Sequence, residues 1–452
     1  MNSEVRFEAE FFWKRYLHEA SALSKWPQKL IGDFANVTDG PHGYHVVDES
    51  SPVVMLTAKN TKDWFSDRDS ADPLAVFVHE ANQRSSLVEN DVILSTRGTV
   101  GLCALVTSEV LPANIDQDVA RISLAPASGF LPGFVIAYLN SSFGQDHMQR
   151  FSSGMVQQGL SLQKVREIPV PMLSESFQKR VSNAVNTALA QRRAAVDAQI
   201  TAEQTLLQAL DLQNWQPPET LTYTRRASEA LAAARLDSNF FAPARYATLE
   251  KLAAMPHRLL SECCDSIRDL LDPTKTQDIA IVRNFDVTDA LKPSLDDSKE
   301  IIEVSELGST KKIMKSGDVV ISRLRSYLRQ IAVVRTSKSV PTVGSTEFII
   351  LRPKKGISPE LLQVFLRSQP VQTILKYCQE GNQHPRFGEY NLLEIPFPDV
   401  LLEHSEQIIT HIRQAHSARQ QAQALLAKAK CAVELAIEEG EKAALIFLDG
   451  KS

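Results

Sequence analysis

Short runs of β-branched residues recur along the chain and are separated by polar or glycine-containing stretches. Such runs are typical of strands, and they fall into two groups. Each group is followed by an apolar segment that predicts a helix. The predicted strands are Val53–Leu56, Asp91–Ser95, Leu102–Val106 and Ala120–Leu124, then Ile279–Val282, Asp318–Ser322, Ile331–Val334 and Phe348–Leu351, and the predicted helices are Phe134–Leu139 and Pro359–Arg367.

A different pattern fills two polar, alanine-rich and proline-free stretches, 174–213 and 402–443. Apolar and alanine residues recur there at spacings of four and three, which predicts the heptad seam of a coiled coil. Each stretch predicts a helix of roughly 35–40 residues, about 55–60 Å long. The seam positions are Val181, Val185, Ala188, Arg192, Ala195, Gln199, Ala202, Leu206 and Ala209 in the first stretch, and Ile408, Ile412, Ala415, Arg419, Ala422, Leu426, Ala429, Val433 and Ala436 in the second.

The alanine-rich seams predict how these helices are buried. Alanine costs no helix propensity, and its small side chain lets two helix backbones approach closely. Since neither helix can bury its seam alone, we expect the two helices to pack against each other. The alternative is that each helix lies on its own domain, but the matched period, length and arginine position favour pairing.

The order of these elements repeats because the chain carries an internal duplication. Near the start of each half, Arg6–Phe12 and Pro27–Leu30 match Arg235–Phe241 and Pro256–Leu259 at an offset of 229 residues. Further on, we expect the offset to stay at 227. The segments matched at that offset are Asp91–Ile93 with Asp318–Val320, Leu139–Ser141 with Leu366–Ser368, Gly154 with Gly381, and Glu167–Pro171 with Glu394–Pro398.

The duplication predicts an α+β fold with two similar αβ domains, separated by long helices that pair as an antiparallel coiled-coil spacer with approximate two-fold character. The repeated IPxP segment is expected to stop each domain, because proline resists helix and central strand alike. The paired phenylalanines of Arg6–Phe12 and Arg235–Phe241 are expected to pack onto a domain or the coiled coil, with partner docking as the alternative. The predicted parts are an N-terminal segment 1–26, a first domain 27–173, a first long helix 174–214, a linker with the start of the second repeat 215–255, a second domain 256–400 and a second long helix 401–445.

Composition suits a globular protein of about two to four domains, with 452 residues of which 43% are hydrophobic. No apolar stretch approaches the length of a membrane span, and the acidic start differs from a secretion signal, so we expect a cytoplasmic protein. The five cysteines are an odd number without a CxxC pair. They predict buried structural thiols rather than disulfides or zinc ligands.

The net charge of −5 argues mildly against nucleic-acid binding, but the charge is unevenly distributed. Residues 27–172 carry 10 lysines and arginines against 16 aspartates and glutamates, a net charge of −6. Residues 256–398 carry 20 against 18, a net charge of +2. Neither half is strongly basic, so non-specific affinity for phosphates should be weak. A DNA-reading protein of this composition would need local basic loops or a partner that adds positive charge.

Several motifs, in duplicated order, carry a resemblance to a known family. The block Glu89–Gly101, the glycine–glutamine segment Gly154–Ser161, and IPVP followed by a long helix are similar to segments of the DNA-specificity (S) subunit of Type I restriction–modification systems. In the second half, Ser316–Arg323 keeps the start of the block, but Leu324–Tyr327 replaces its glycine-rich end. The resemblance spans nearly the whole chain.

The resemblance implies a division of labour within a larger complex that defends the cell against phage. Each domain would read one half of a split double-stranded DNA site, and the helix pair would act as a ruler between them. The chain would dock modification subunits, expected to be two, which methylate adenine with S-adenosylmethionine. A restriction subunit that uses ATP and Mg²⁺ for translocation and cleavage would also join. None of these cofactors would bind this chain, and no membrane would be involved.

Motifs for catalysis are absent from the sequence. It lacks an Asn/Asp-Pro-Pro-aromatic motif for a flipped adenine, a phosphate-binding GxxxxGK[ST] loop, GxGxxG, HExxH and GxSxG. The ten histidines show no metal-ligand spacing. We therefore predict a non-catalytic subunit.

Base-reading residues are expected in loops, because arginine and lysine match guanine, whereas asparagine and glutamine match adenine. The basic run Arg323, Arg325 and Arg329 could serve phosphates instead. His42 is a further loop residue, and Gly98, Gly101, Gly154 and Gly159 are expected to set loop geometry. The candidates are Tyr44, His45, Lys59, Asn60, Thr96, Arg97, Gln157 and Gln158 in the first domain, and Arg323, Arg325, Tyr327, Arg329, Asn382, Gln383, His384 and Arg386 in the second.

Two other functions remain open from the sequence. The long alanine-rich helices and negative charge would also suit a coiled-coil scaffold that binds protein partners only. An enzyme with an unfamiliar active site is disfavoured, because no catalytic group is duplicated or clustered. If the chain does read DNA, the different loops of its two domains predict an asymmetric, bipartite site.

Overall fold

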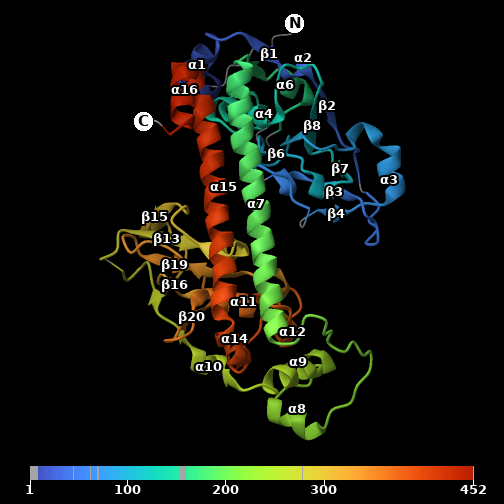
Figure 1. The fold of residues 1–452 in the computed structure, drawn as a ribbon, viewed down its shortest axis with the longest axis vertical. Helices are drawn as coiled ribbons and strands as arrows, with labels where there is room; N and C mark the ends of the chain where they lie inside the picture. The colour runs from blue at the N-terminus through green and yellow to red at the C-terminus, as the bar shows by residue number, and fades with distance from the viewer. Residues whose placement is uncertain are drawn as a thin grey trace. The chain divides into compact units, whose positions relative to one another are not determined.

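The computed structural model describes residues 9–43, 45–61, 63–68, 71–152, 159–276 and 278–450. The chain forms two compact units, unit 1 with residues 1–193 and 419–452, and unit 2 with residues 194–418. Both units combine helices with small sheets (Figure 1), which confirms the predicted α+β class. The bounds of the six parts given above stay a prediction.

Unit 1 builds its sheets from short strands. The strands are β1 (Gln28–Leu30), β2 (Ala35–Asp39), β3 (Val54–Leu56), β4 (Asp72–Pro73), β5 (Val92–Ser95), β6 (Cys103–Leu105), β7 (Ala113–Ile115), β8 (Val119–Leu124) and β9 (Pro169–Pro171). An antiparallel sheet has the order β2-β8-β5-β6, and a second sheet has the order β4-β3-β7 with β3 parallel to β7. The helices are η1 (Ala9–Phe12), α1 (Lys14–Leu23), α2 (Ile31–Phe34), η2 (Ala58–Thr61), α3 (Val76–Ala81), η3 (Gln83–Ser85), η4 (Ser108–Val110), α4 (Pro132–Leu139), α5 (Ser142–Phe151), α6 (Leu162–Arg166) and α16 (Glu441–Leu448).

Unit 2 repeats this plan with additional strands. Its strands are β10 (His257–Leu259), β11 (Cys264–Ile267), β12 (Leu270–Leu271), β13 (Ile281–Phe285), β14 (Ser294–Leu295), β15 (Ile301–Glu303), β16 (Lys311–Met314), β17 (Val319–Ser322), β18 (Ile331–Val334), β19 (Thr342–Gly344), β20 (Phe348–Pro353) and β21 (Pro396–Pro398). The sheet orders are β11-β20-β17-β18-β14 and β12-β16-β19-β13-β15. The helices are α8 (Ala227–Ala233), η5 (Asn239–Phe241), α9 (Pro243–Ala253), α10 (Leu260–Cys263), η6 (Val287–Leu291), η7 (Val304–Glu306), η8 (Ser326–Leu328), α11 (Pro359–Arg367), α12 (Gln369–Tyr377), α13 (Glu389–Leu393) and α14 (Val400–Glu403).

The strands and helices predicted from the apolar pattern are present, with ends shifted by at most a few residues. In each unit the strand of the repeated block, β5 or β17, is central and pairs antiparallel with both neighbours. All residues of β5 and β17 are buried, which explains why these strands read as continuous apolar runs.

The IPxP segments behave differently from the prediction that proline simply stops each domain. Pro169–Pro171 and Pro396–Pro398 form strands β9 and β21, which pair antiparallel with β1 and β10. Each ladder has only two strands, so the missing amide hydrogens of the prolines can face away from the partner. The ladders also explain the repeat of Pro27–Leu30 at Pro256–Leu259, because these segments lead into the strands that the IPxP segments pair with.

The offset between the two halves of the chain is not constant at 227 residues, contrary to the prediction. It changes after the central strands β5 and β17. Strand pairing aligns Val92 with Val319 at 227, but it aligns Leu105 with Val333 at 228. The next strand is shifted to 229, because Ile122 and Leu351 occupy equivalent positions opposite the central strand. Loops absorb such changes while burial keeps the strand register, so the loop lengths differ and the pairing of the central strand with its two neighbours is retained.

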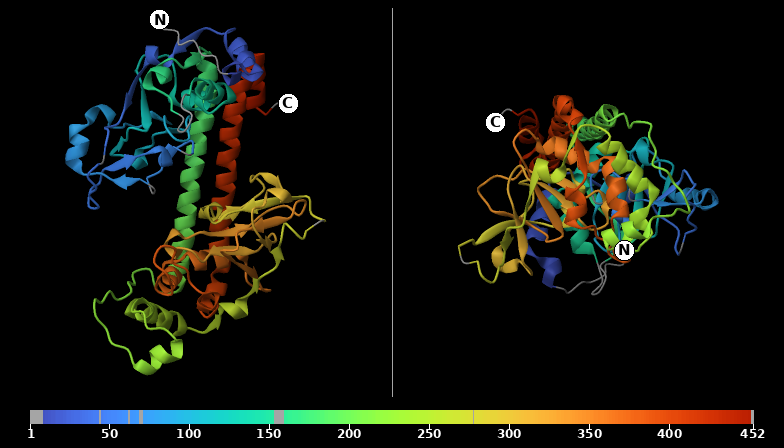
Figure 2. Two further views of the ribbon diagram at one scale, coloured as in Figure 1. Left: turned by 180° about the vertical axis from the view of Figure 1, so that it is seen from behind. Right: turned by 90° about the horizontal axis from the view of Figure 1, so that it is seen from below.

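The two long helices are α7 (Glu175–Ala209) and α15 (Ser405–Glu439), each shared between the units. In unit 1 the first part of α7 and the last part of α15 lie side by side, and in unit 2 the remaining parts do so (Figures 1 and 2). Within each unit the two helices are therefore antiparallel, as predicted. The apolar and alanine seam positions are buried, from Val181, Val185, Ala188, Ala195, Ala202 and Leu206 to Ile408, Ile412, Ala415, Ala422, Leu426, Ala429 and Val433.

The seam positions do not only face the other long helix. In unit 1, Phe177 and Val181 belong to one apolar cluster with α4 and with Ala429 of α15. Phe177 meets the ring of Phe134 edge to face, with ring centroids 6.4 Å apart. Pairing and packing onto the same domain, which the sequence presents as alternatives, therefore occur together.

The arginines of the two seams lie at the edge of the apolar contact. Arg192 is half-buried, and its Nη1 lies 3.0 Å from Oδ2 of Asp63 while its guanidinium lies over the Phe65 ring. Arg419 is also half-buried, and burial lowers its pKa. Both positions keep a polar head at the border of an apolar seam, as arginine allows.

All five cysteines are free. Four are buried as predicted, but Cys431 is exposed, because it lies on the side of α15 away from the seam. Among the described residues, no helix is both long and apolar enough to cross a membrane.

Candidate nucleic-acid interface

In unit 1, three loop segments meet beyond the end of β5. The amide of Thr96 donates to the carbonyl of Asp118, 2.8 Å away, and the amide of Leu160 donates to the carbonyl of Thr96, also 2.8 Å away. Arg97 and Gly159 form an isolated antiparallel bridge. The guanidinium of Arg97 donates to the Asp118 carboxylate at 3.2 Å and remains exposed. We call this meeting of three segments the readout junction.

Unit 2 builds the same readout junction with different side chains. The amide of Arg323 donates to the carbonyl of Glu347 at 3.0 Å, and the amide of Phe387 donates to the carbonyl of Arg323 at 3.1 Å. Leu324 and Arg386 form the equivalent bridge. The backbone contacts of the two junctions correspond one to one, so the frame is conserved while the side chains on it differ.

The second loop keeps the shape of the first although it lacks the glycines. Gly98 and Gly101 have φ angles of +73° and +91°. The corresponding positions in unit 2 are Arg325 and Arg329, with φ angles of +46° and +48°. A side chain in this left-handed region costs on the order of 1 kcal/mol. The loop therefore holds two arginines in a strained backbone conformation. Backbone strain of this kind is common at functional sites.

If the chain reads DNA, as the sequence predicts, Arg325→Gly is expected to raise stability and weaken DNA binding together. Glycine removes the left-handed penalty, so the free energy of unfolding should rise by about 0.5–1 kcal/mol. Loss of one cation should reduce affinity for DNA several-fold and lower its salt dependence by about one ion. Thermal unfolding and fluorescence anisotropy measure the two effects. Arg325→Lys is the matched control, which should change neither strongly, and a destabilised Arg325→Gly variant would contradict the strain argument.

A carboxylate lies between two arginines of the unit 2 junction. Glu347 accepts from Nε of Arg323 at 2.8 Å and from Nε and Nη2 of Arg386 at 3.1 and 2.8 Å. The bonds from Arg386, then those from Arg323, hold the pKa of Glu347 below its usual range. These contacts bring together Arg323 and Arg386, two candidates that are distant in the sequence.

The remaining unit 2 candidates lie on the same segments. Nη2 of Arg325 donates to the carbonyl of Gln383 at 3.2 Å and lies 3.4 Å from Nδ1 of His384. The Tyr327 side chain is 62% exposed, large for an aromatic residue. Nη1 of Arg329 lies 3.8 Å from Glu203 of α7, so this arginine points toward the long helix. Asn382, Gln383 and His384 are exposed.

The unit 1 candidates separate into buried and exposed residues. Asn60 is 2% exposed, with its carbonyl oxygen accepting from the amide of Thr57 and its amide donating to the carbonyl of Asp67. Thr96 is also buried. These two side chains belong to the fold rather than to a surface. Lys59 and Arg97 are exposed, His45 is half-exposed, and His42 is exposed 3.7 Å from Asp39. Tyr44, Gly154, Gln157 and Gln158 lie outside the described residues.

The aspartate of the repeated block has a structural task. Asp318 is 1% exposed and accepts two bonds from Arg352, at 2.8 and 2.9 Å, as well as the amide of Lys315. Asp91 of unit 1 accepts one bond, from Nε of Arg121 at 2.6 Å, together with the amide of Val88 at 2.9 Å. This motif therefore orients the central strand that carries the readout loop and does not itself offer a side chain to DNA.

The sequence analysis missed Asp118 and Glu347. Each is the last residue before a strand, β8 or β20, and each carries a carboxylate that binds an arginine of the readout junction. Their separation of 229 residues is outside the assumed offset of 227, which is why they were not paired. A search with variable offset would find them.

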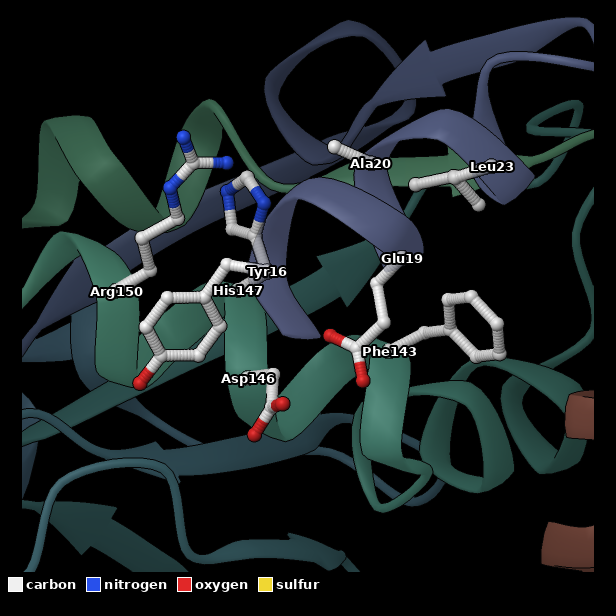
Figure 3. Close-up of a pocket in the computed structure, with 8 residues that line it drawn as sticks. All are labelled: Tyr16, Glu19, Ala20, Leu23, Phe143, Asp146, His147 and Arg150. Carbon is white, nitrogen blue, oxygen red and sulfur yellow. The ribbon is translucent and has the colours of Figure 1, made fainter. Parts of the chain in front are cut away.

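A pocket between α1 and α5 of unit 1 holds a pair of carboxyl groups. Figure 3 shows Glu19 and Asp146 close together, with the Tyr16 ring near them and the Arg150 guanidinium directed away. Burial, then the charge and hydrogen bond of Asp146, raise the pKa of Glu19 to about 8. Burial, then the positive charge of Arg150, lower the pKa of His147 to about 4. The raised pKa favours a protonated Glu19 at neutral pH, and its hydrogen bond to Asp146 links α1 to α5.

Glu19→Gln is expected to flatten the pH dependence of stability. The folded state keeps a proton on Glu19 between about pH 4.5 and 8 that the unfolded state releases, so the wild-type stability falls as pH rises through that window. Because Glu19 is partly exposed, the gain of the variant at pH 8 should be only about 1 kcal/mol. Thermal melts from pH 5 to 8.5 measure it, with the exposed Glu49→Gln as control. Parallel profiles for wild type and Glu19→Gln would count against the raised pKa of Glu19.

Among the described residues, no group of three or more histidine, cysteine, aspartate or glutamate side chains is arranged to hold a metal ion. The arrangement offers hydrogen-bond donors on rigid loops instead. Such a surface suits recognition of a polar, negatively charged partner.

Comparison with known proteins returned structures but no family. No protein-family model and no curated protein matches the chain. The chain is similar to the HsdS subunit from Thermoanaerobacter tengcongensis, with 15% identity over 92% of this chain and 97% of that chain and a TM-score of 0.30. It is also similar to the S subunit of the Type I restriction–modification system from M. genitalium, with 12% identity over 94% and 96% and a TM-score of 0.36.

A third similar structure comes from a description of complex assembly and conformational transition in the Type I restriction–modification system. Its identity is 16%, over 94% of this chain and 97% of that chain, with a TM-score of 0.28. The first two structures are named as S subunits of such systems.

Proposed function

We propose that this chain is a DNA-specificity subunit of a Type I restriction–modification complex and reads an asymmetric, bipartite site. The observation that carries the proposal is the readout junction, which has the same backbone contacts in both units and different side chains on them. A recognition protein needs this combination, because a rigid frame positions side chains and the side chains specify the bases.

The chemistry of the junctions supports DNA as the partner. Arg97 and Arg323 present guanidinium groups at exposed positions, Arg325 is half-buried beside them, and Tyr327 adds an exposed aromatic ring. Guanidinium groups suit guanine edges and phosphates. The overall charge of −5 gives little non-specific attraction, so affinity would depend on these few contacts and on a partner's positive charge.

The long helices are the proposed ruler and docking element. Each runs through 35 residues and is shared between the units, so its length would contribute to the gap between the two half-sites. Modification subunits, two in number, would supply S-adenosylmethionine and methylate adenine, and a restriction subunit would supply ATP- and Mg²⁺-dependent cleavage. The chain itself would perform no catalysis.

The experiment that tests the proposal is single-molecule sequencing of the adenine methylome of the native host, with and without this gene. One asymmetric bipartite motif should disappear with the gene and return on complementation. A continuous or palindromic motif would contradict the two-domain reading. If no motif changes although a methyltransferase co-purifies with the chain and is active, the chain is a protein-only scaffold.

A further inference from the structure

We propose that Glu347 is a positioning residue for base recognition by unit 2. Glu347 holds the Arg323 side chain so that the two terminal nitrogens of Arg323 meet a guanine edge. Arg386 in turn holds Glu347 in place. This inference rests on the proposed function and deepens it. It assigns different tasks to three residues that form one cluster, Arg323–Glu347–Arg386.

Every nitrogen of the Arg386 guanidinium already donates a hydrogen bond within the protein, so neither terminal nitrogen is as open to a base as those of Arg323. Nε and Nη2 of Arg386 both donate to the Glu347 carboxylate, and its Nη1 donates to the carbonyl of His384 at 3.0 Å. Its backbone pairs with Glu380 in both directions, at 2.8 and 2.9 Å. A guanidinium held at all three nitrogens is a fixed structural part, and it orients the carboxylate that it grips.

Arg323 is held at one end and open at the other. Its Nε donates to Oε2 of Glu347 at 2.8 Å, and its side chain is 44% exposed. Within the described part of the chain, Nη1 and Nη2 of Arg323 have no hydrogen-bond partner. The carboxylate thus removes the freedom of the long side chain while both terminal nitrogens stay available.

An arginine held in this way matches guanine best among the bases. Guanine presents two acceptors, N7 and O6, to the major groove, and a guanidinium fork can donate to both. Ordering a free arginine on binding costs on the order of 0.5–1.5 kcal/mol, and Glu347 removes much of that cost in advance. The carboxylate also repels phosphates, which directs the fork to a base edge rather than to the backbone.

The other positive groups near the cluster are differently engaged. Lys312 donates to the carbonyl of Phe348 at 2.7 Å, and burial, more than nearby Arg323 and Arg268, lowers its pKa. Arg329 points toward Glu203. Arg325 sits beside His384 on the neighbouring segment and pairs with no carboxylate of the described residues. It therefore suits a phosphate, whereas Arg323 suits a base.

Unit 1 lacks this device at the equivalent positions. Thr96 stands where unit 2 has Arg323, and Gly159 stands where it has Arg386. Asp118 binds Arg97 through a terminal nitrogen, Nη1, rather than through Nε. The Asp118–Arg97 pair therefore leaves only part of the fork free, so the two half-sites should be read by different chemistry.

The test is DNA binding by the full chain with its methyltransferase partner, measured by anisotropy on the native site and on duplexes with each base pair replaced. The variants are Glu347→Gln, Glu347→Asp and Arg386→Lys. In Glu347→Gln, discrimination at one guanine of one half-site should fall about tenfold, while affinity for unrelated duplexes rises because a negative charge is lost. Glu347→Asp should recover part of the discrimination, and Arg386→Lys should resemble Glu347→Gln.

Controls separate this inference from the proposed function and from misfolding. Asp399→Asn breaks another arginine pair of unit 2, with Arg258 at 2.7 Å, and should leave every base preference unchanged. Unchanged base preferences in the other half-site would show that the variant is folded. A wild-type complex without any sequence preference would refute the proposed function itself. With a specific wild type, unchanged preferences in Glu347→Gln, or uniform weakening over all sequences, would overturn the positioning role.

Discussion

Asp318→Ala is expected to lower the free energy of unfolding of unit 2 by about 3 kcal/mol. The carboxylate is 1% exposed and binds Arg352 through both oxygens, and one of them also accepts the Lys315 amide. Removing one partner of a buried pair leaves the other charge uncompensated, which typically costs about 3–5 kcal/mol. We expect the lower end because Arg352 is partly exposed. For a unit of about 200 residues, this corresponds to a fall in Tm of roughly 6–12 °C.

Differential scanning calorimetry of the whole chain measures this effect. The matched control is Asp265→Ala, which removes an exposed carboxylate 3.4 Å from Lys354 and should cost less than about 1 kcal/mol. Equal losses in the two variants would show that the buried pair adds nothing special. The DNA preference of Asp318→Ala at temperatures below its transition should be close to wild type, since Asp318 lies under the readout loop and not on it.

Gly133→Ala is expected to destabilise unit 1 by about 2 kcal/mol, because it forces α4 away from α7. An added Cβ would lie 2.7 Å from the Cα of Ser182, where the backbone of α7 cannot yield cheaply. The contact is reinforced by Gln178 of α7, which accepts from the amide of Leu131 and donates to the carbonyl of Gly129. The fall in Tm should be about 4–8 °C.

Gly308→Ala is the matched control for this variant. No atom lies within 4 Å of the Cβ that alanine would add there, so its Tm should stay near wild type. A Gly133→Ala variant as stable as Gly308→Ala would mean that α4 and α7 can separate without cost. The domain would then be less firmly attached to the long helix than the ruler model of the helices requires.

Local pattern predicted most of the fold, since burial determines both the period of apolar residues and the register of strands. The central strands β5 and β17 and the buried seam from Val181 to Val433 are examples. The long-range partners were not predictable in this way. The ladder of β9 with β1 joins segments about 140 residues apart, and a proline-rich segment carries no local signal of its partner.

The candidate interface was predicted in part, because residue type indicates chemistry but not exposure. Arg323, Arg325 and Arg386 were predicted and lie together on one junction. Asn60 has the right side chain for a base, yet its two ends are bound inside the protein. Glu347 was not predicted, because a carboxylate by itself does not indicate a DNA-reading site. Its role becomes visible only when the structure shows the arginines that it binds.

The sequence by itself determined the duplication, the strand and helix types, the paired seams and the kinds of side chain available for recognition. Periodicity and repetition are properties of the chain, and burial of one face makes them readable. Only the tertiary structure decided that Thr96 meets Asp118 and Leu160, and that Arg323 meets Glu347 and Phe387. It also decided that Arg325 and Arg329 take the backbone shape of two glycines. Contacts between distant segments depend on loop lengths and on the packing of the whole unit, which no local pattern contains.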